Sequence, residues 1–169
     1  LAAITVGTEL GVPDDAIRSA LESFAGIGRR FQSYGDILLG GHRVTLIDDY
    51  GHHPREMAAT MLAMRRAWPE RRLVLAFQPH RYSRTHALFD DFVSILSTPD
   101  VAVVLDIYAA GETPIEGITS RAICNSMRQR GQREPFYVSK EQSLAECLTH
   151  VVREGDVVMT LGAGNIGAM

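Results

Sequence analysis

Three short segments of the chain bring together residue types that can do chemistry. DDYGHHP, residues 48–54, holds two carboxylates, a tyrosine and two histidines. FQPHRYSRTH, residues 77–86, holds two arginines between histidines and hydroxyl groups. DIYAAGETPIEGITS, residues 106–120, carries three further acidic residues, among them Asp106 and Glu112, and is long for a connecting loop. Such residues could hold a metal ion, exchange protons, or bind a charged ligand.

The DDYGHHP segment favours ligand binding over a metal site. Adjacent His52 and His53 point in different directions, and no HxxxH or HxH spacing accompanies them. Asp48 or Asp49 could cap the following helix or loop, but that leaves Tyr50 and the histidines without a role. A carboxylate at the end of a strand also suits a ribose, because it can accept hydrogen bonds from two neighbouring hydroxyls. Both the capping and the ribose interpretations stay open at this point.

The arginines at positions 81 and 84 suggest an anion site. If a helix has begun by Arg81, a spacing of three places both guanidinium groups on one face, beside free backbone N–H groups. Arginines in a first turn oppose the helix dipole unless an anion is present, which favours binding over a merely solvated face. Asp106 and Glu112 are further candidates, since loops of this length are often functional, although a solvated surface loop is an equal alternative.

Composition narrows the class of protein. The chain has 169 residues and a formal charge of −3 with scattered basic residues, which predicts one domain that does not bind nucleic acid. Two isolated cysteines, Cys124 and Cys147, favour a reducing, cytoplasmic compartment. No apolar stretch approaches the ~20 residues that span a bilayer. The chain opens at Leu1 within a helical pattern, so we expect a piece of a longer protein.

The hydrophobic periodicity predicts a sheet of the α/β class. Residues 1–26 form two helices, and GIGRRFQ is a linker. Strands are expected at 31–39, 43–48, 71–78, 101–107, 135–138 and 156–161, and helices at 54–67, 84–97, 119–131 and 140–153. Repeated strand–helix units imply a mostly parallel sheet with helices on both faces, and the first strand should be antiparallel. The loops at 48–54, 78–84, 106–117 and 161–167 then share the edge where ligands bind.

The last motif, GAGNIG at residues 162–167, fits the dinucleotide pattern GxGxxG after a strand. Its context differs from that fingerprint, because no further strand and no acidic residue follow about 20 residues later. We therefore expect these glycines to form a tight turn from a strand into a helix. A dinucleotide-binding oxidoreductase domain remains the alternative that this motif alone would support.

The motifs together resemble a known family. GIGRRFQ, DDYGHHPREMAAT, FQPHRYSRT, YAAGETPIEGITS and GAGNIG, in this order and spacing, are similar to the C-terminal domain of the Mur ligases of bacterial peptidoglycan synthesis. The resemblance covers nearly the whole chain. It points to the branch that uses ATP to join L-alanine to UDP-N-acetylmuramate through an acyl phosphate. A recycling branch that adds a tripeptide shares HHP but differs at HRYSR.

The resemblance implies a Rossmann-like, three-layer αβα domain of about six strands at residues 27–169. Residues 1–26 would be the last helices of a central domain, which in the family carries a phosphate loop, a carbamylated lysine and the ligands of Mg²⁺. Since that phosphate loop is absent here, ATP and Mg²⁺ would be bound mainly outside this chain, and the chain alone should be inactive. Its partners would be the N-terminal and central domains, in the bacterial cytoplasm. A non-catalytic interaction domain is the third hypothesis.

The resemblance also implies which residues bind. Arg30 would contact the phosphates of the nucleotide, and Asp49 would contact its ribose. The positions expected to face the amino acid and the muramoyl end are Tyr50, His52, His80, Arg81 and Arg84. His53 is expected to be structural, and Pro54 should begin the helix that holds the loop. The ligase hypothesis requires Asp49 and Arg81 to lie at the same edge of the sheet.

Overall fold

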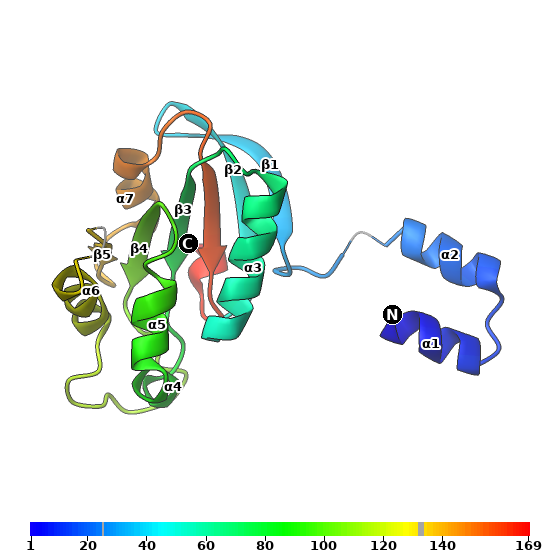
Figure 1. Ribbon diagram of the computed structural model, residues 1–169, viewed down its shortest axis with the longest axis horizontal. Coiled ribbons are helices and arrows are strands. Elements are labelled where there is room, and N and C mark those ends of the chain that lie inside the picture. The colour runs from blue at the N-terminus through cyan, green and yellow to red at the C-terminus, as the bar shows by residue number, and fades with distance from the viewer. Residues whose placement is uncertain (25, 132–133) are drawn as a thin grey trace.

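The computed structural model of the chain describes residues 1–24, 26–131 and 134–169. The described residues form a six-stranded sheet with the order β1-β2-β6-β3-β4-β5 (Figure 1). Its strands are β1 (Gln32–Leu39), β2 (His42–Asp49), β3 (Leu73–Phe77), β4 (Val101–Leu105), β5 (Phe136–Val138) and β6 (Val157–Leu161). Each lies within two residues of its predicted position, because strong alternation or continuous apolar runs marked every strand.

Strand direction places the polar loops together. β1 pairs with β2 in the antiparallel sense, and β2, β6, β3, β4 and β5 run parallel to one another. The register aligns Asp49 with Leu161 and Leu161 with Phe77, so these three strands end side by side. The prediction of a mostly parallel sheet with one antiparallel strand is confirmed. Asp49 and the segment that carries Arg81 therefore lie at the same edge.

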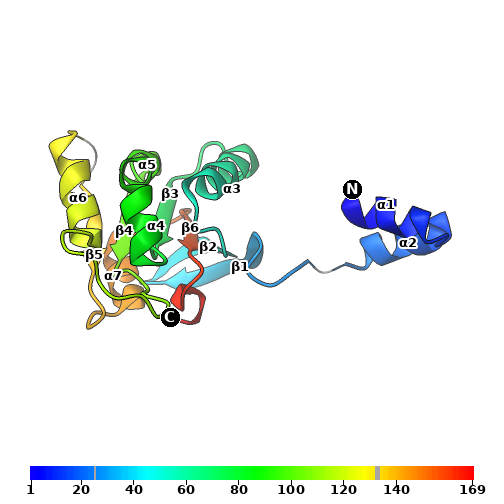
Figure 2. The same ribbon diagram turned by 90° about the horizontal axis from the view of Figure 1, so that it is seen from below.

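Helices cover both faces of the sheet. They are α3 (Pro54–Ala67), α4 (Tyr82–Ala87), α5 (Phe89–Ile95), α6 (Ser120–Gln129) and α7 (Leu144–Val151), with the short 3-10 helix η1 (Ile166–Ala168) after β6. α3, α5 and α6 lie on one face, and α7 lies on the other, as Figure 2 shows from below. The predicted three-layer arrangement is confirmed.

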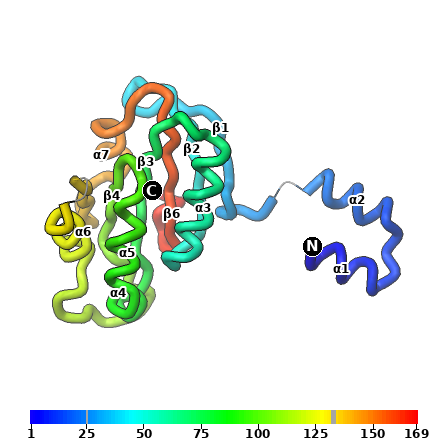
Figure 3. Tube along the Cα trace, in the orientation of Figure 1, coloured from blue at the N-terminus to red at the C-terminus, as the bar shows by residue number. Residues whose placement is uncertain are grey.

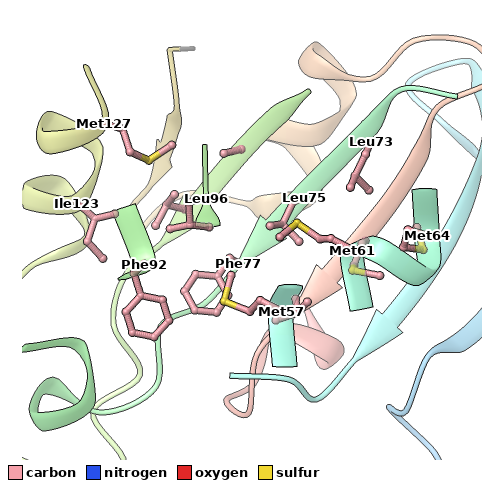
Figure 4. Close-up of a cluster of buried hydrophobic side chains, with 14 of the residues drawn as sticks. Met57, Met61, Met64, Leu73, Leu75, Phe77, Phe92, Leu96, Ile123 and Met127 are labelled. Atoms are coloured by element: carbon pink, nitrogen blue, oxygen red, sulfur yellow. The ribbon is translucent and has the colours of Figure 1, made fainter. Parts of the chain in front are cut away.

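The larger core lies beneath α3, α5 and α6. Met57 and Met61 of α3, Phe77 of β3 and Phe92 of α5 are buried in it (Figure 4). The rings of Phe77 and Phe92 lie 5.4 Å apart. A smaller core joins the opposite face of the sheet to α7, where Leu148 is buried. Burial of these apolar side chains on both faces is what fixes the sheet and, with it, the edge where the loops meet.

The helix expected at residues 84–97 is two helices. α4 ends and α5 begins around Leu88, whose backbone angles of φ −119° and ψ 25° break the helical path. The sequence did not reveal this break, because the apolar spacing continues across it to the buried Phe92. In α3, Met57, Met61 and Met64 are buried, whereas the apolar Leu62 is 53% exposed.

The first two helices stand apart from the sheet. α1 (Ala2–Glu9) and α2 (Asp14–Glu22) form a pair at one end of the molecule, and a linker joins them to β1 (Figures 1 and 3). Neither helix contains a buried residue, and the apolar Leu21 of α2 is 48% exposed. None of the helices in the described ranges is long and apolar enough to cross a membrane.

Candidate functional site

Four aromatic rings from three loops form a continuous row at the carboxyl edge of the sheet. Tyr50 and His52 make an edge contact with centroids 5.7 Å apart, and the rings of His52 and His80 lie 5.8 Å apart. His80 stacks on Tyr108 at 5.5 Å with an interplanar angle of 13°. We call Tyr50, His52, His80 and Tyr108 the aromatic row. It joins the loops that follow β2, β3 and β4 into one surface.

Backbone pairing holds the second and third loops against each other. The N–H of Arg81 donates to the carbonyl of Tyr108, and the N–H of Tyr108 donates to the carbonyl of Pro79, both at 2.8 Å. These bonds extend the parallel pairing of β3 and β4 by an isolated bridge at His80 and Tyr108. The stacking of the two rings thus follows from strand register. Sequence reasoning did not select Tyr108, although its position at a strand end was the signal that could have found it.

The two aspartates of DDYGHHP are both turned inward. Asp49 is 7% exposed, and its carboxylate accepts hydrogen bonds from the N–H groups of Phe31 and Gly51, both at 2.7 Å. Asp48 is 2% exposed and accepts from the Arg29 guanidinium at 2.9 Å and the Thr160 hydroxyl at 2.6 Å. The capping interpretation therefore holds for Asp49. Its carboxylate closes the turn at Gly51 and binds the linker at Phe31.

The rest of this loop is fixed by the start of α3. His53 is the N-cap residue, and its Nδ1 accepts from the N–H of Arg55 at 3.2 Å. Glu56 completes the capping box by accepting from the N–H groups of His52 and His53. Pro54 begins the helix, as expected. His53 therefore has a structural contact in this loop, whereas the ring of His52 is left in the aromatic row.

The two neighbouring arginines of the linker make different contacts. Arg29 donates to Asp48 and to the carbonyls of Gly162 at 2.5 Å and Gly164 at 3.1 Å, so it joins the linker to the last loop. The guanidinium of Arg30 is exposed and lies 5.4 Å from the centre of the Tyr50 ring. Arg30, the residue that the sequence selected, therefore borders the aromatic row. Arg29 borders it too, with its guanidinium 5.2 Å from the centre of the Tyr50 ring, but is also hydrogen-bonded into the domain.

Arg81 has an uncommon backbone conformation. It precedes α4 with φ 74° and ψ 136°, so the condition that a helix has begun by Arg81 is not met. The expected free N–H groups are also absent at Ser83, whose N–H and hydroxyl donate to Glu112 at 2.9 and 2.6 Å. Within the described part of the chain, the exposed guanidinium of Arg81 has no hydrogen-bond partner. An anion could therefore be bound by arginine side chains here, but not by the start of α4.

Arg84 is held directly against the aromatic row. Its Nη1 lies 3.2 Å from the carbonyl oxygen of His80 and 3.3 Å from His80 Nδ1. Burial lowers the pKa of His80, and the positive charge of Arg84 lowers it further. A neutral imidazole can accept a hydrogen bond from Arg84 through one nitrogen and keep the other for a ligand. Tyr50, His52, His80 and Arg84 are thus brought together as the sequence predicted.

The glycines of GAGNIG are used for packing inside the domain. A Cβ atom on Gly164 would lie 2.2 Å from the Oε1 of Gln78, and one on Gly162 would lie 2.8 Å from the carbonyl oxygen of Gln78. Gln78 in turn donates to Asn165 and accepts from the N–H of Ile166. The motif is the expected tight turn, and its last two residues begin η1, a single 3-10 turn.

Asp106, the other candidate in the third loop, makes local contacts. It accepts hydrogen bonds from the hydroxyl of Tyr137 and from the N–H of Lys140. It also lines a cavity of about 510 Å³ beside Tyr108. In the ranges that the structure describes, no group of three or more histidine, cysteine or acidic side chains is arranged to hold a metal ion.

Comparison with known proteins now identifies the family. Residues 29–164 match the family described as Mur ligase, glutamate ligase domain. The chain belongs to this family. The Mur ligase match covers all six strands, from the linker residue Arg29 to the glycine turn. It therefore includes every loop of the aromatic row.

Solved structures of Mur ligases and related enzymes share the fold. The chain is 26% identical to UDP-N-acetylmuramate-alanine ligase MurC from Thermotoga maritima, with a TM-score of 0.70 over 98% of this chain and 33% of that one. A murein peptide ligase from Psychrobacter arcticus is 21% identical, with a TM-score of 0.61 over 89% of this chain and 30% of that chain. Folylpolyglutamate synthase from Thermotoga maritima is 12% identical, with a TM-score of 0.55 over 91% of this chain and 31% of that chain. The chain thus spans about a third of each of these enzymes.

Proposed function

We propose that this Mur ligase domain is the C-terminal part of an enzyme that joins L-alanine to UDP-N-acetylmuramate. ATP would phosphorylate the muramate carboxylate, giving an acyl phosphate and ADP. The amine of L-alanine would then attack the acyl carbon, and phosphate would leave as the amide forms. The observation that carries the proposal is the convergence of Tyr50, His52, His80 and Arg84 at one edge of the sheet. The likeness to MurC over 98% of the chain supports it.

The two arginines of the second loop suit the charges of this reaction. Arg81 presents an exposed guanidinium, and Arg84 is oriented by His80. A planar guanidinium can bind the carboxylate of L-alanine with two hydrogen bonds, and a second positive charge stabilises the oxyanion and the departing phosphate. The aromatic row would form the wall against which the amino acid lies, with Tyr50, His52 and His80 as its contacts.

Arg30 and Asp49 are proposed to face the nucleotide. The exposed guanidinium of Arg30 is free to approach phosphate oxygens, and the Tyr50 ring limits where it can lie. Asp49 already accepts from two backbone N–H groups. Each of its oxygens keeps one further lone pair, so it could accept from a ribose hydroxyl without giving up the turn. Its small exposed surface restricts that contact to a group placed directly above the loop.

We further propose that residues 1–26 are the last helices of a central domain and that 27–169 form the C-terminal domain. Exposed apolar side chains on the two helices and just beyond their ends support this division, among them Val6, Leu10 and Phe24. Apolar surface of this kind is normally covered by another part of a protein. ATP and Mg²⁺ would be bound mainly by that central domain, and the chain would add Arg30 and Asp49 to their site.

The amino acid acceptor is the part of the proposal most open to test. The complete ligase that contains this chain is supplied with ATP, Mg²⁺ and UDP-N-acetylmuramate, and phosphate release is measured with L-alanine, a murein tripeptide or L-glutamate. We expect release only with L-alanine. Preference for the tripeptide or for glutamate would contradict the proposed substrate, and no release with any acceptor would favour a non-catalytic domain. The 169-residue chain alone should release no phosphate.

A further inference from the structure

The backbone of Arg81 has to be held by its surroundings. A φ of 74° is a conformation that residues with a side chain rarely adopt, and such outliers persist where neighbouring structure enforces them. In the site proposed above, this conformation decides the direction of the Arg81 side chain.

Two residues of the third loop, Tyr108 and Glu112, make contacts that can hold Arg81 in this conformation, in addition to Thr85 of α4, whose N–H and hydroxyl donate to the Arg81 carbonyl. The carbonyl of Tyr108 accepts from the N–H of Arg81, and the Tyr108 ring stacks on His80, the residue before it. Glu112 accepts from the N–H and hydroxyl of Ser83, two residues after Arg81. Arg81 is thus held on both sides by Tyr108 and Glu112.

The segment is itself fixed in shape. The N–H of Glu112 donates to the carbonyl of Ala109 at 3.0 Å, and Ala110 and Gly111 have positive φ angles of 49° and 85°. This tight turn directs Glu112 back toward the second loop. On the other side, a Cβ on Gly164 would lie 2.8 Å from the Tyr108 Cγ, so the glycine turn supports the Tyr108 ring.

We propose that Tyr108 and Glu112 are positioning residues, which hold Arg81 in its left-handed conformation and so direct its guanidinium into the amino acid site. One part of this proposal, the orientation of Arg81 toward the amino acid, rests on the function proposed above. The backbone effect on Arg81 does not depend on that function. Glu112 itself would contact no substrate, since its carboxylate is occupied by Ser83.

The backbone effect is tested in the 169-residue chain by NMR, with φ of Arg81 taken from scalar and residual dipolar couplings. We expect a positive φ in the wild type and its loss in Glu112→Ala and in Tyr108→Ala. Glu112→Gln keeps an acceptor for Ser83, and Tyr108→Phe keeps the stacked ring, so both should preserve the positive φ. Glu116→Ala, in the same loop and exposed, is the matched control. A positive φ retained in both alanine variants would overturn the proposal.

The functional consequence is tested in the complete ligase. We expect Glu112→Ala to raise the KM for L-alanine about 10-fold, since small displacements of a binding group are costly, and to change kcat by less than about twofold. Glu112→Gln should restore the KM, and Glu116→Ala should leave it unchanged. An unchanged KM in Glu112→Ala overturns the positioning role. If the enzyme does not use L-alanine at all, the proposed function fails, while the NMR result still decides whether Arg81 is held as described.

Discussion

At the scale of single residues, the site keeps the positive charges of its arginines and avoids a further positive charge on His80. His80 lies between two arginines and beside His52, so a proton on its ring would add a third positive charge to a crowded region. Burial and then the charge of Arg84 lower its pKa. The neutral ring can accept from Arg84 and stack on Tyr108, which makes His80 the residue that joins the arginine pair to the aromatic row.

The pH dependence of His80 follows from this environment. In the folded protein the pKa of His80 lies below the ordinary value of 6.5, which the unfolded chain keeps. In the pH window between the folded and the unfolded pKa, the unfolded chain therefore binds the proton more readily than the folded protein. The stabilising contribution of neutral His80 is therefore complete above pH 6.5 and is lost as the pH falls through that window. An NMR titration of the His80 ring should show a midpoint below 6.5 that rises in Arg84→Ala. A midpoint at or above that value in the wild type would contradict the account.

The residues of the site could be predicted from sequence to the extent that motif spacing determines them. The convergence of Tyr50, His52 and His80 followed from the ends of β2 and β3 lying at one edge. The inward turn of Asp49 could not be read from the sequence, because its partners include Phe31, 18 residues earlier. Tyr108 was missed for a similar reason, since its stacking depends on the register of two strands.

At the scale of elements, the glycine turn after β6 holds the edge of the sheet together. Its carbonyl groups accept from Arg29 of the linker, and its glycines allow Gln78 and Tyr108 to approach from the neighbouring strands. Continuous apolar runs located the strands reliably. The division of the expected helix at 84–97 was not visible, because the break at Leu88 keeps the apolar face intact.

The packing role of the glycine turn can be tested by adding one methyl group. Gly164→Ala would place a Cβ against the Gln78 side chain and the Tyr108 ring. Overpacking of this kind should cost about 1–3 kcal/mol of unfolding free energy, measured by urea denaturation. Gly28→Ala is the matched control, because its Cβ would meet only the Gln32 side chain at 3.7 Å, and it should change stability by less than about 0.5 kcal/mol. Equal stabilities of the two variants would argue against the packing role.

At the scale of the whole molecule, stability resides in the sheet and the helices packed on it. The two cores lie mainly between the strands and the helices packed on them, and neither α1 nor α2 contributes a buried residue. The linker is different, because Arg29 and Phe31 donate hydrogen bonds into the domain. The boundary of the folding unit should therefore lie between α2 and Arg29.

Two truncations locate that boundary. Residues 27–169 should unfold within about 2 °C of the complete chain in scanning calorimetry, since no buried contact is removed. Residues 32–169 lose Arg29, which leaves the buried carboxylate of Asp48 without its arginine partner. That second truncation should lower Tm by at least about 4 °C. A large loss of stability in the first truncation would show that the helices belong to the same folding unit.

The most direct test of the central claim is the use of L-alanine by arginine variants of the complete ligase. Arg81→Ala and Arg84→Ala each remove a guanidinium from the proposed amino acid site. Arg66→Ala removes an exposed guanidinium from the last turn of α3 and serves as the control. We predict that kcat/KM for L-alanine falls at least about 10-fold in the first two variants, as expected for lost charged contacts, and is unchanged in Arg66→Ala. Values for Arg81→Ala and Arg84→Ala equal to that of Arg66→Ala would contradict the account.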